Sequence, residues 1–313
     1  MENKLHIDVS PHIGTKRTTA NIMLDVLIAL IPALVAGSVI FGLRALLVVA
    51  VTVSFSVLSE FVFCIITKRK NTIGDLSAAV TGLLLGLNLP VTAPLWQCAV
   101  GSVFAIIVVK SLFGGIGQNF ANPAITARVF LLISFAGTMG GGAVPKISSN
   151  PDLVSGATPL SVFSKGGVLP SLKDMFLGLR GGAIGETCAL ALIIGFIYLA
   201  LRKVIYFETP IIYVATVFVL SLIADNSFTL AAYQVLSGGL IIGAVFMITD
   251  YSTTPITRVG KMIFAFGCGL ITFLIRYFGS YPEGVSFAIL IMNILSPYIE
   301  SWTKRRPFGG DIK

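Results

Sequence analysis

A short run of small and hydroxyl residues holds a side chain that could carry covalent chemistry. The run reads Asp152-Leu153-Val154-Ser155-Gly156-Ala157-Thr158 and is followed by Pro159. The Thr158 hydroxyl is a poor nucleophile unless a base activates it, and no histidine lies in this part of the chain. A group attached to Thr158 would therefore need a separate transferase, and the small residues before it would let that enzyme approach the backbone. The same residues also make a good turn, so both interpretations stay open.

Acidic side chains lie in or at the edges of apolar segments, where charge is costly and often functional. They are Glu60, Glu186, Glu208, Asp250, Glu283 and Glu300. Glu60 lies deepest within its apolar segment, so it is the best single candidate for ion coupling, with no particular ion assigned. Arg128 also lies in an apolar segment, but near its end, where a long side chain could extend to the membrane surface.

Cysteine and histidine, the usual ligands of iron–sulfur clusters, zinc and haem, are scattered. The cysteines are Cys64, Cys98, Cys188 and Cys268. Their spacing excludes a local CxxC-type motif, and buried structural cysteine is commoner than four thiols that meet in space. His6 and His12 both precede the first apolar run, which excludes a bis-histidine haem within the bilayer. Any redox role would therefore need a bound organic cofactor.

The composition is that of a membrane protein. Hydrophobic residues make up 55% of the 313 residues and charged residues 12%, whereas soluble domains carry roughly 25% charged residues. The net charge of +8 is explained by lysines and arginines in loops that fix topology. Nucleic-acid binding is not expected, because no basic cluster is interleaved with aromatic residues. The polar residues 1–20 give no cleavable signal peptide.

Long stretches without charge predict about ten short transmembrane helices. The predicted segments are Val26–Leu43, Ala45–Thr67, Leu76 to about Pro90, Pro94 to about Phe113, Pro123–Thr138, Ala183–Leu201, Thr209–Ala224, Phe228–Thr249, Met262–Phe278 and Gly284–Glu300. The fold class is therefore an all-α polytopic membrane protein. Most lysines and arginines outside the longest loop fall on one side, which predicts that both termini are cytoplasmic and the loop at 140–182 extracytoplasmic.

The order of these helices predicts two inverted five-helix halves, residues 1–139 and 183–313, on either side of the loop at 140–182. Five helices in each half give the halves opposite orientations, as in inverted-repeat transporters. Gly82 and Gly86 resemble Gly239 and Gly243 as GxxxG pairs, which let helices approach closely. Such pairs also arise by chance in glycine-rich membrane proteins, and the two interpretations have equal weight.

The run that ends at Thr158 resembles the D-x-x-S-G-A-T flavinylation motif, in which the last threonine is esterified to the phosphate of FMN. The resemblance implies covalent FMN on Thr158, with Asp152, Ser155, Gly156 and Ala157 as the other motif residues. It also implies that a flavin transferase matures the protein.

Nearly the whole chain resembles the RnfD/NqrB family of the Rnf and Na⁺-NQR redox pumps. The matching stretches are Ser10-Pro11-His12, Gly114–Ala124, Thr249-Asp250 and Ser286–Asn293. NqrB proteins carry an extended region before the first helix, so this chain is more similar to the RnfD branch.

The family resemblance implies a subunit of an inner-membrane complex that couples ferredoxin and NAD⁺ to Na⁺ or H⁺ translocation. The chain would carry electrons and would not be catalytic alone. Expected partners are soluble iron–sulfur and NAD-binding subunits, a second subunit with covalent FMN, and other membrane subunits. The resemblance also implies a second, non-covalent flavin, riboflavin, within the helices.

Asn119 and Asn122 precede Pro123, a residue that favours a helix start. Asn122 is expected to cap this helix, and both amides could also hydrogen-bond a flavin ring. The alternative function is an inverted-repeat transporter or channel for a small solute, which would need no covalent cofactor. A scaffold within a larger complex is a third interpretation.

Overall fold

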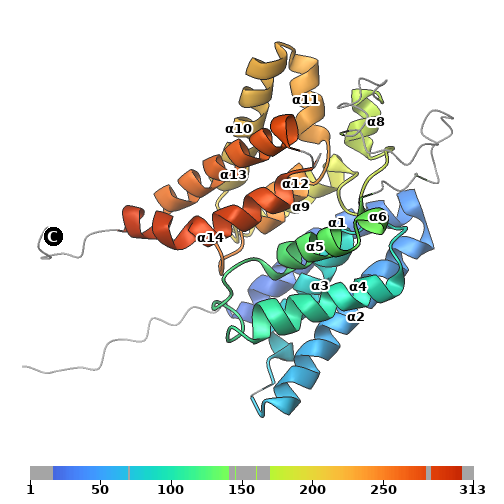
Figure 1. Ribbon diagram of the computed structural model, residues 1–313, viewed down its shortest axis with the longest axis vertical. Helices are drawn as coiled ribbons and strands as arrows, with labels where there is room; N and C mark the ends of the chain where they lie inside the picture. Colours follow the sequence, from blue (N-terminus) through green and yellow to red (C-terminus); the bar gives the residue numbers. More distant parts are fainter. Residues whose placement is uncertain are drawn as a thin grey trace, which may run out of the picture.

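The structure is built from helices, because a chain in lipid must satisfy its backbone hydrogen bonds within each segment. The computed structural model describes residues 17–69, 71–140, 145, 160, 170–279 and 283–304, and every regular element within these residues is a helix. Figure 1 shows the helices of the first half, in blue to green, beside those of the second half, in yellow to red.

Each predicted helical segment contains at least one helix. In chain order the elements are α1 (Thr19–Phe41), α2 (Leu43–Ile66), the 3₁₀ turn η1 (Ile73–Asp75), α3 (Ser77–Leu87), α4 (Leu95–Val103), the π-helix η2 (Phe104–Ser111), α5 (Pro123–Ser134), α6 (Ala136–Met139), α8 (Leu172–Leu177), α9 (Ala189–Leu201), α10 (Glu208–Asp225), α11 (Phe228–Leu236), α12 (Leu240–Ile242), the π-helix η4 (Gly243–Met247), α13 (Arg258–Phe278) and α14 (Val285–Thr303).

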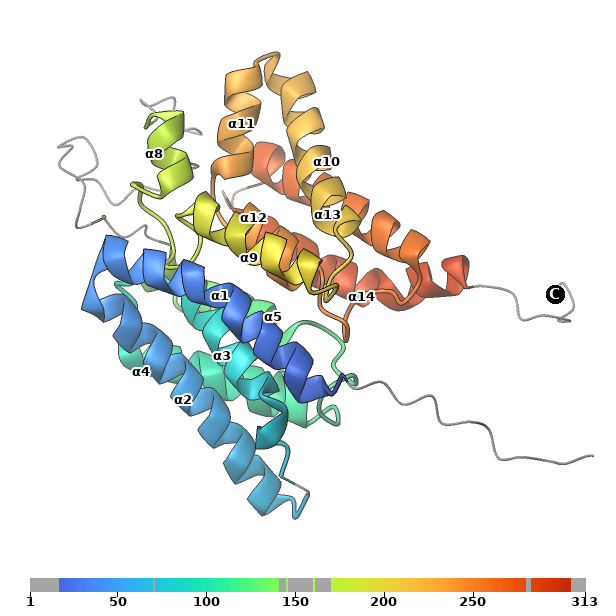
Figure 2. The same ribbon diagram turned by 180° about the vertical axis from the view of Figure 1, so that it is seen from behind.

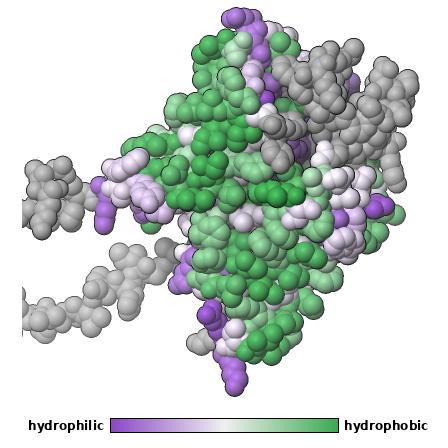
Figure 3. Space-filling view, in the orientation of Figure 1, coloured by the Kyte–Doolittle hydropathy of each residue, from purple (hydrophilic) through white to green (hydrophobic). Residues whose placement is uncertain are grey.

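The described helices differ in their capacity to cross a bilayer. Five of them, α1, α2, α10, α13 and α14, are long and apolar enough, and α11 with α12–η4 forms a sixth span if this bent pair is counted as one. The apolar helices α3, α4–η2, α5 and α9 are shorter. A multi-pass membrane protein is therefore confirmed, whereas ten full spans in two inverted halves, divided by the loop at 140–182, stay a prediction. Apolar side chains cover most of the face in Figure 3, and hydrophilic ones gather at its ends.

One predicted helix starts later than expected. The segment from Ala183 is irregular, and α9 begins at Ala189. The backbone N–H groups of Ile184 and Gly185 donate to the carbonyls of Leu89 (3.1 Å) and Leu87 (2.7 Å). These carbonyls lie at the end of α3, which leaves them free to accept. The segment therefore pairs with the end of α3 instead of forming a helical turn.

The predicted helix Phe228–Thr249 is broken. Its two parts, α11 and α12–η4, meet at an angle of 66°. The Arg276 guanidinium, on α13, donates to the carbonyls of Gln234 (2.5 Å) and Ser237 (3.0 Å). A helix break within a membrane is tolerated where its free carbonyls find such donors.

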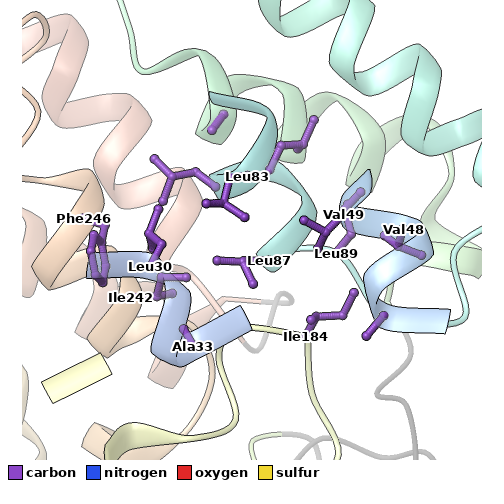
Figure 4. Packing of buried hydrophobic residues seen from close by; sticks show 14 of the residues in the cluster. Leu30, Ala33, Val48, Val49, Leu83, Leu87, Leu89, Ile184, Ile242 and Phe246 are labelled. Carbon is purple, nitrogen blue, oxygen red and sulfur yellow. The ribbon is translucent and has the colours of Figure 1, made fainter. Parts of the chain in front are cut away.

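Helix α5 belongs to both hydrophobic cores. Ala124, Ala127 and Leu131 pack into a cluster with α1, α2, α3 and α9, and Figure 4 shows part of this cluster around Leu87 and Ile184. The opposite side of α5, with Ile125 and Val129, packs into a second cluster with α10, α12–η4, α13 and α14. Since helices bury apolar stripes against their neighbours, α5 connects the two cores, as α12–η4 also does.

Charged ends of several helices meet at one end of the molecule. Arg17, just before α1, donates to the carbonyl of Arg202 (2.9 Å), just after α9. Arg258 of α13 donates to Glu208 of α10 (2.8 Å). Figure 2 shows the start of α1 and the end of α9 on the same side. The basic residues Arg17, Arg202 and Arg258, which the topology prediction places on the cytoplasmic side, therefore lie at the same end of the fold.

The GxxxG pair of α3 lies at a close helix contact. A Cβ atom at Gly82 would lie 2.7 Å from Cα of Val53 and 2.8 Å from the Thr52 carbonyl, both on α2. The small residue therefore lets the two backbones approach, as the sequence pattern predicts.

We expect Gly82→Val to destabilise the protein by about 1–3 kcal/mol, because the added atoms overlap the backbone of α2. The matched control is Gly137→Val, since a Cβ at this helical glycine meets no described atom within 4 Å. Thermal unfolding of the detergent-solubilised chain is the measurement. Equal melting temperatures for the two variants would contradict the close contact.

Candidate functional site

A cleft of about 110 Å³, called the first cleft here, opens between α1, α3, α5 and η4. Its lining includes Asn119, Asn122, Lys110 and Asp250, so the structure brings together the two asparagines singled out in the sequence. Atom Oδ1 of Asn119 is buried and has no hydrogen-bond partner among the described residues. The first cleft therefore presents an acceptor that a ligand N–H or O–H can satisfy.

Asn122 caps α5, as predicted. Its Oδ1 accepts hydrogen bonds from the backbone N–H groups of Ala124 (3.0 Å) and Ile125 (3.3 Å), while its Nδ2 donates to Asp250 at 3.4 Å. Asn293 of α14 adds a second link. With its amide group oriented to suit both neighbours, its nitrogen donates to the Thr253 carbonyl (3.2 Å) and its oxygen accepts from the backbone N–H of Asn122 (3.1 Å). The start of α5 is therefore fixed to the segment that follows η4.

Asp250 is a half-buried carboxylate outside the helices. It accepts hydrogen bonds from the N–H and hydroxyl of Ser252 (3.2 and 3.1 Å) and from the Thr253 hydroxyl (3.2 Å). Burial raises the pKa of Asp250, and these hydrogen bonds oppose the increase. The wall of the first cleft therefore contains a carboxylate that the protein only partly stabilises in its charged form.

Glu60 is buried, but it is not a free charge. The Lys110 ammonium lies 2.7 Å from its Oε1, and the Thr72 hydroxyl donates to the same oxygen at 2.7 Å. Lys110 also donates to the Ser77 hydroxyl (2.5 Å), while Oε2 of Glu60 has no hydrogen-bond partner in the described chain. Lys110 lies within the helix predicted from Pro94 to about Phe113, and the π-helix η2, which continues α4, turns its side chain inward.

A second cleft, of about 150 Å³, opens toward the other end of α5. Its lining includes Asn88, Arg128 and Glu283, and also Gly140 and Gly182. The latter two glycines are the ends of the longest loop, so this cleft lies where the loop leaves and rejoins the helices.

Arg128 lies at the centre of a buried charge cluster next to the second cleft. Its Nη1 lies 2.6 Å from Oε1 of Glu186 and donates to Asn88 Oδ1 at 2.7 Å, and its Nη2 forms an ion pair with Glu283. Arg128 is 6% exposed. It therefore pairs within the protein and does not extend to the membrane surface, contrary to one sequence interpretation.

Glu186 comes from the irregular segment before α9. Its side chain is buried, and its Oε2 atom has no hydrogen-bond partner among the described residues. Arg180 of the same segment donates to the Glu186 carbonyl at 2.9 Å and is itself buried. The Glu186 carboxylate packs against Gly239, beside the helix break. A Cβ atom added at Gly239 would lie 2.8 Å from Oε1 of Glu186, so a larger residue there would crowd the carboxylate.

The flavinylation motif lies outside the described residues. Thr158, Ser155, Gly156, Ala157 and Asp152 therefore have no structural account. Two residues after Thr158, however, Leu160 is described and buried. Gly238 has no side chain, but a Cβ atom added there would lie 2.8 Å from Cδ1 of Leu160. The same added atom would lie 3.3 Å from the Arg276 guanidinium and 3.9 Å from Cγ of Glu283. Leu160 is thus anchored next to the second cleft.

The chain is similar to known proteins along almost its full length. The model of a family described as NQR2, RnfD, RnfE matches residues 6–309. The D subunit of the Na⁺-translocating ferredoxin:NAD⁺ oxidoreductase complex of Acetobacterium woodii is 47% identical, over 98% of this chain and 96% of that protein. The D subunit of the proton-translocating ferredoxin:NAD⁺ oxidoreductase complex of Clostridium ljungdahlii is 38% identical (98% and 97%), and that of an ion-translocating oxidoreductase complex of Escherichia coli is 33% identical (96% and 97%).

Proposed function

Because the chain belongs to the NQR2, RnfD, RnfE family, we propose that it is the flavin-carrying electron-transfer subunit of an Rnf-type pump. It is a subunit of an ion-translocating oxidoreductase complex, as its relatives are. The observation that carries the proposal is the end-to-end match to the D subunits of such complexes. The two clefts support the proposed flavin sites.

Covalent FMN on Thr158 has support from the second cleft. The loop that contains Thr158 begins and ends at this cleft, and Leu160 is anchored beside it. Arg128 and Glu283 line this cleft and offer charged groups to a flavin bound there. Their charged donors and acceptors fit the polar edge of an isoalloxazine ring, and Val129, Leu132 and Phe287 fit its apolar face.

Riboflavin in the first cleft is supported by the unpartnered Oδ1 of Asn119 and by the apolar residues Val80, Leu84 and Phe246 that share the lining. In this proposal Asn119 accepts a hydrogen bond from the ring, and Asn122 and Asp250 hold the cleft wall in place.

The bound flavins would supply one-electron and two-electron chemistry, and the chain positions them. Ala124 lines the first cleft and Arg128 the second, and helical rise separates these residues by about 6 Å along α5. Electrons would pass from an extracytoplasmic flavin subunit through the two clefts toward other membrane subunits. Ferredoxin and NAD⁺ would be bound by partner chains with iron–sulfur and NAD sites.

The transporter alternative has one specific observation in its favour, the bent helix pair α11 and α12–η4. Broken helices carry the substrate sites of many transporters. The match to oxidoreductase subunits over nearly the whole chain favours the electron-transfer role.

In-gel fluorescence tests the covalent flavin. We expect the chain, co-expressed with its flavin transferase, to give a fluorescent band on a denaturing gel, and Thr158→Val to abolish it because the ester oxygen is lost. Ser161→Ala is the matched control and should keep the band. A dark wild-type band, with a known flavoprotein labelled in the same cells, would refute covalent FMN.

The non-covalent flavin is tested by Asn119→Ala. We expect the variant to lose at least half of the riboflavin extracted from purified protein, because the ring loses a hydrogen bond in a buried site. Asn21→Ala, which changes an exposed asparagine on α1, should keep full content. Unchanged riboflavin in Asn119→Ala would place the flavin elsewhere.

Glu60 is the proposed ion-coupling residue of this subunit. We expect Glu60→Gln to lower Na⁺ or H⁺ transport by the assembled complex at least tenfold, because it removes the only carboxylate that faces Lys110 among the described residues. Vesicle uptake is the measurement, and Glu208→Gln at an exposed ion pair is the control. Transport that is intact in Glu60→Gln would exclude this role.

The proposed orientation has both termini in the cytoplasm of an inner-membrane protein. We expect a cysteine at Ser161 to react with a membrane-impermeant maleimide in intact cells, and one at Asn71, in the exposed turn after α2, to react only after lysis. Labelling of Asn71 but not Ser161 in intact cells would reverse the orientation.

A further inference from the structure

The cluster around Arg128 places two carboxylates on one guanidinium. Glu186 and Glu283 both form ion pairs with Arg128. Because like charges close together cannot both ionise without cost, a single guanidinium compensates only one carboxylate of the pair. Away from water this imbalance is expensive, and intramembrane carboxylates are functional by default.

Two further arginines lie close, but their guanidinium groups bond to main-chain carbonyls. Arg180 donates to the carbonyls of Glu186 (2.9 Å) and Thr187 (3.5 Å). Arg276 donates to the carbonyl of Glu283 at 3.3 Å and to those beside the helix break. Neither arginine makes an ion pair with a carboxylate among the described residues. They lower the electrostatic cost of the cluster without pairing with either carboxylate.

Glu186 and Glu283 differ in their access to water. The side chain of Glu283 is 25% exposed and lines the second cleft, whereas that of Glu186 is 1% exposed and lies behind Arg128. Oε2 of Glu186 has no hydrogen-bond partner in the described part of the chain. An ionised, buried oxygen without a donor is costly, and protonation removes that charge.

We propose that Glu186 is a proton-binding site, filled from the second cleft by way of Glu283. A proton from water binds to Glu283 and then moves to Glu186: the O–H bond on Glu283 breaks as the one on Glu186 forms, and no electrons are exchanged. With Glu186 neutral, Arg128 is left with Glu283 as its one ionised partner. The proposal goes beyond the flavin-carrying role, which assigns no ion site next to the second cleft.

The charged and titratable groups that face Glu186 set the direction of each expected effect. They are Arg128 on α5, Glu283 before α14, Arg276 on α13, and Arg180 and Cys188 in the segment of Glu186 itself. Glu283 is the one carboxylate among them, so its charge favours the protonated form of Glu186, as burial does, whereas the arginines favour the ionised form.

Difference infrared spectroscopy of the purified full chain without flavin, across pH 5 to 9, tests the proposal. We expect a carboxylic-acid C=O band that disappears as the pH rises and is absent in Glu186→Gln. The matched control is Asp25→Asn, which removes a buried carboxylate that forms an ion pair with Arg202; it should keep the band. No titrating band in wild type, or an unchanged band in Glu186→Gln, would overturn the proposal.

A second variant keeps the test decisive if Glu186→Gln does not fold. Glu283→Gln removes the competing charge, so the band should persist with a midpoint at least one pH unit lower. A midpoint that rises would overturn the proposal. Replacing choline with sodium as the cation of the buffer should leave the wild-type band unchanged. Loss of the band in sodium would identify a sodium site in place of a proton site. The infrared measurement uses protein without flavin, so a negative result would not affect the flavin proposal. In the same way, a dark band in the gel experiment would not affect the proton-binding proposal.

Discussion

Charged side chains that enter the apolar interior must find their counter-charges there, and this constraint organises the fold. Arg128 comes from the first half of the chain, whereas Glu186 and Glu283 come from the second. Removing one partner of a buried ion pair costs about 3–5 kcal/mol, because the other charge is left uncompensated. The requirement therefore holds the segment before α9 and the segment before α14 against α5, and it builds one wall of the second cleft.

Unpaired backbone groups impose the second constraint. The carbonyls at the end of α3 accept N–H groups from the irregular segment at 184–185, and those at the break before α12 accept from Arg276. In both places non-helical backbone is satisfied inside the protein, as lipid requires. Each break also brings a polar residue to the interior that a continuous helix would have kept away, and Glu186 is the clearest case.

The sequence predicts the helices well, because apolar runs without charge carry that information locally. It also finds the cap at Asn122 and the close approach at Gly82, which depend on neighbouring residues. The later start of α9 could not be predicted, since it depends on hydrogen bonds from Ile184 and Gly185 to a helix about a hundred residues earlier. The pairing of Arg128 and the inward turn of Lys110 depend on tertiary neighbours in the same way. The sequence did contain a sign that Arg128 and Lys110 have buried partners, because each is a lone cation near the end of an apolar run.

The two clefts share α5, and this has a mechanical consequence. Side chains on opposite sides of α5 are packed into separate cores, and closely packed interiors transmit strain and resist compression. A displacement of α5 would have to repack both cores at once. The separation between the two clefts along α5 is therefore a stiff dimension of the molecule, set at folding, and occupants of the clefts would lie at a fixed distance from each other.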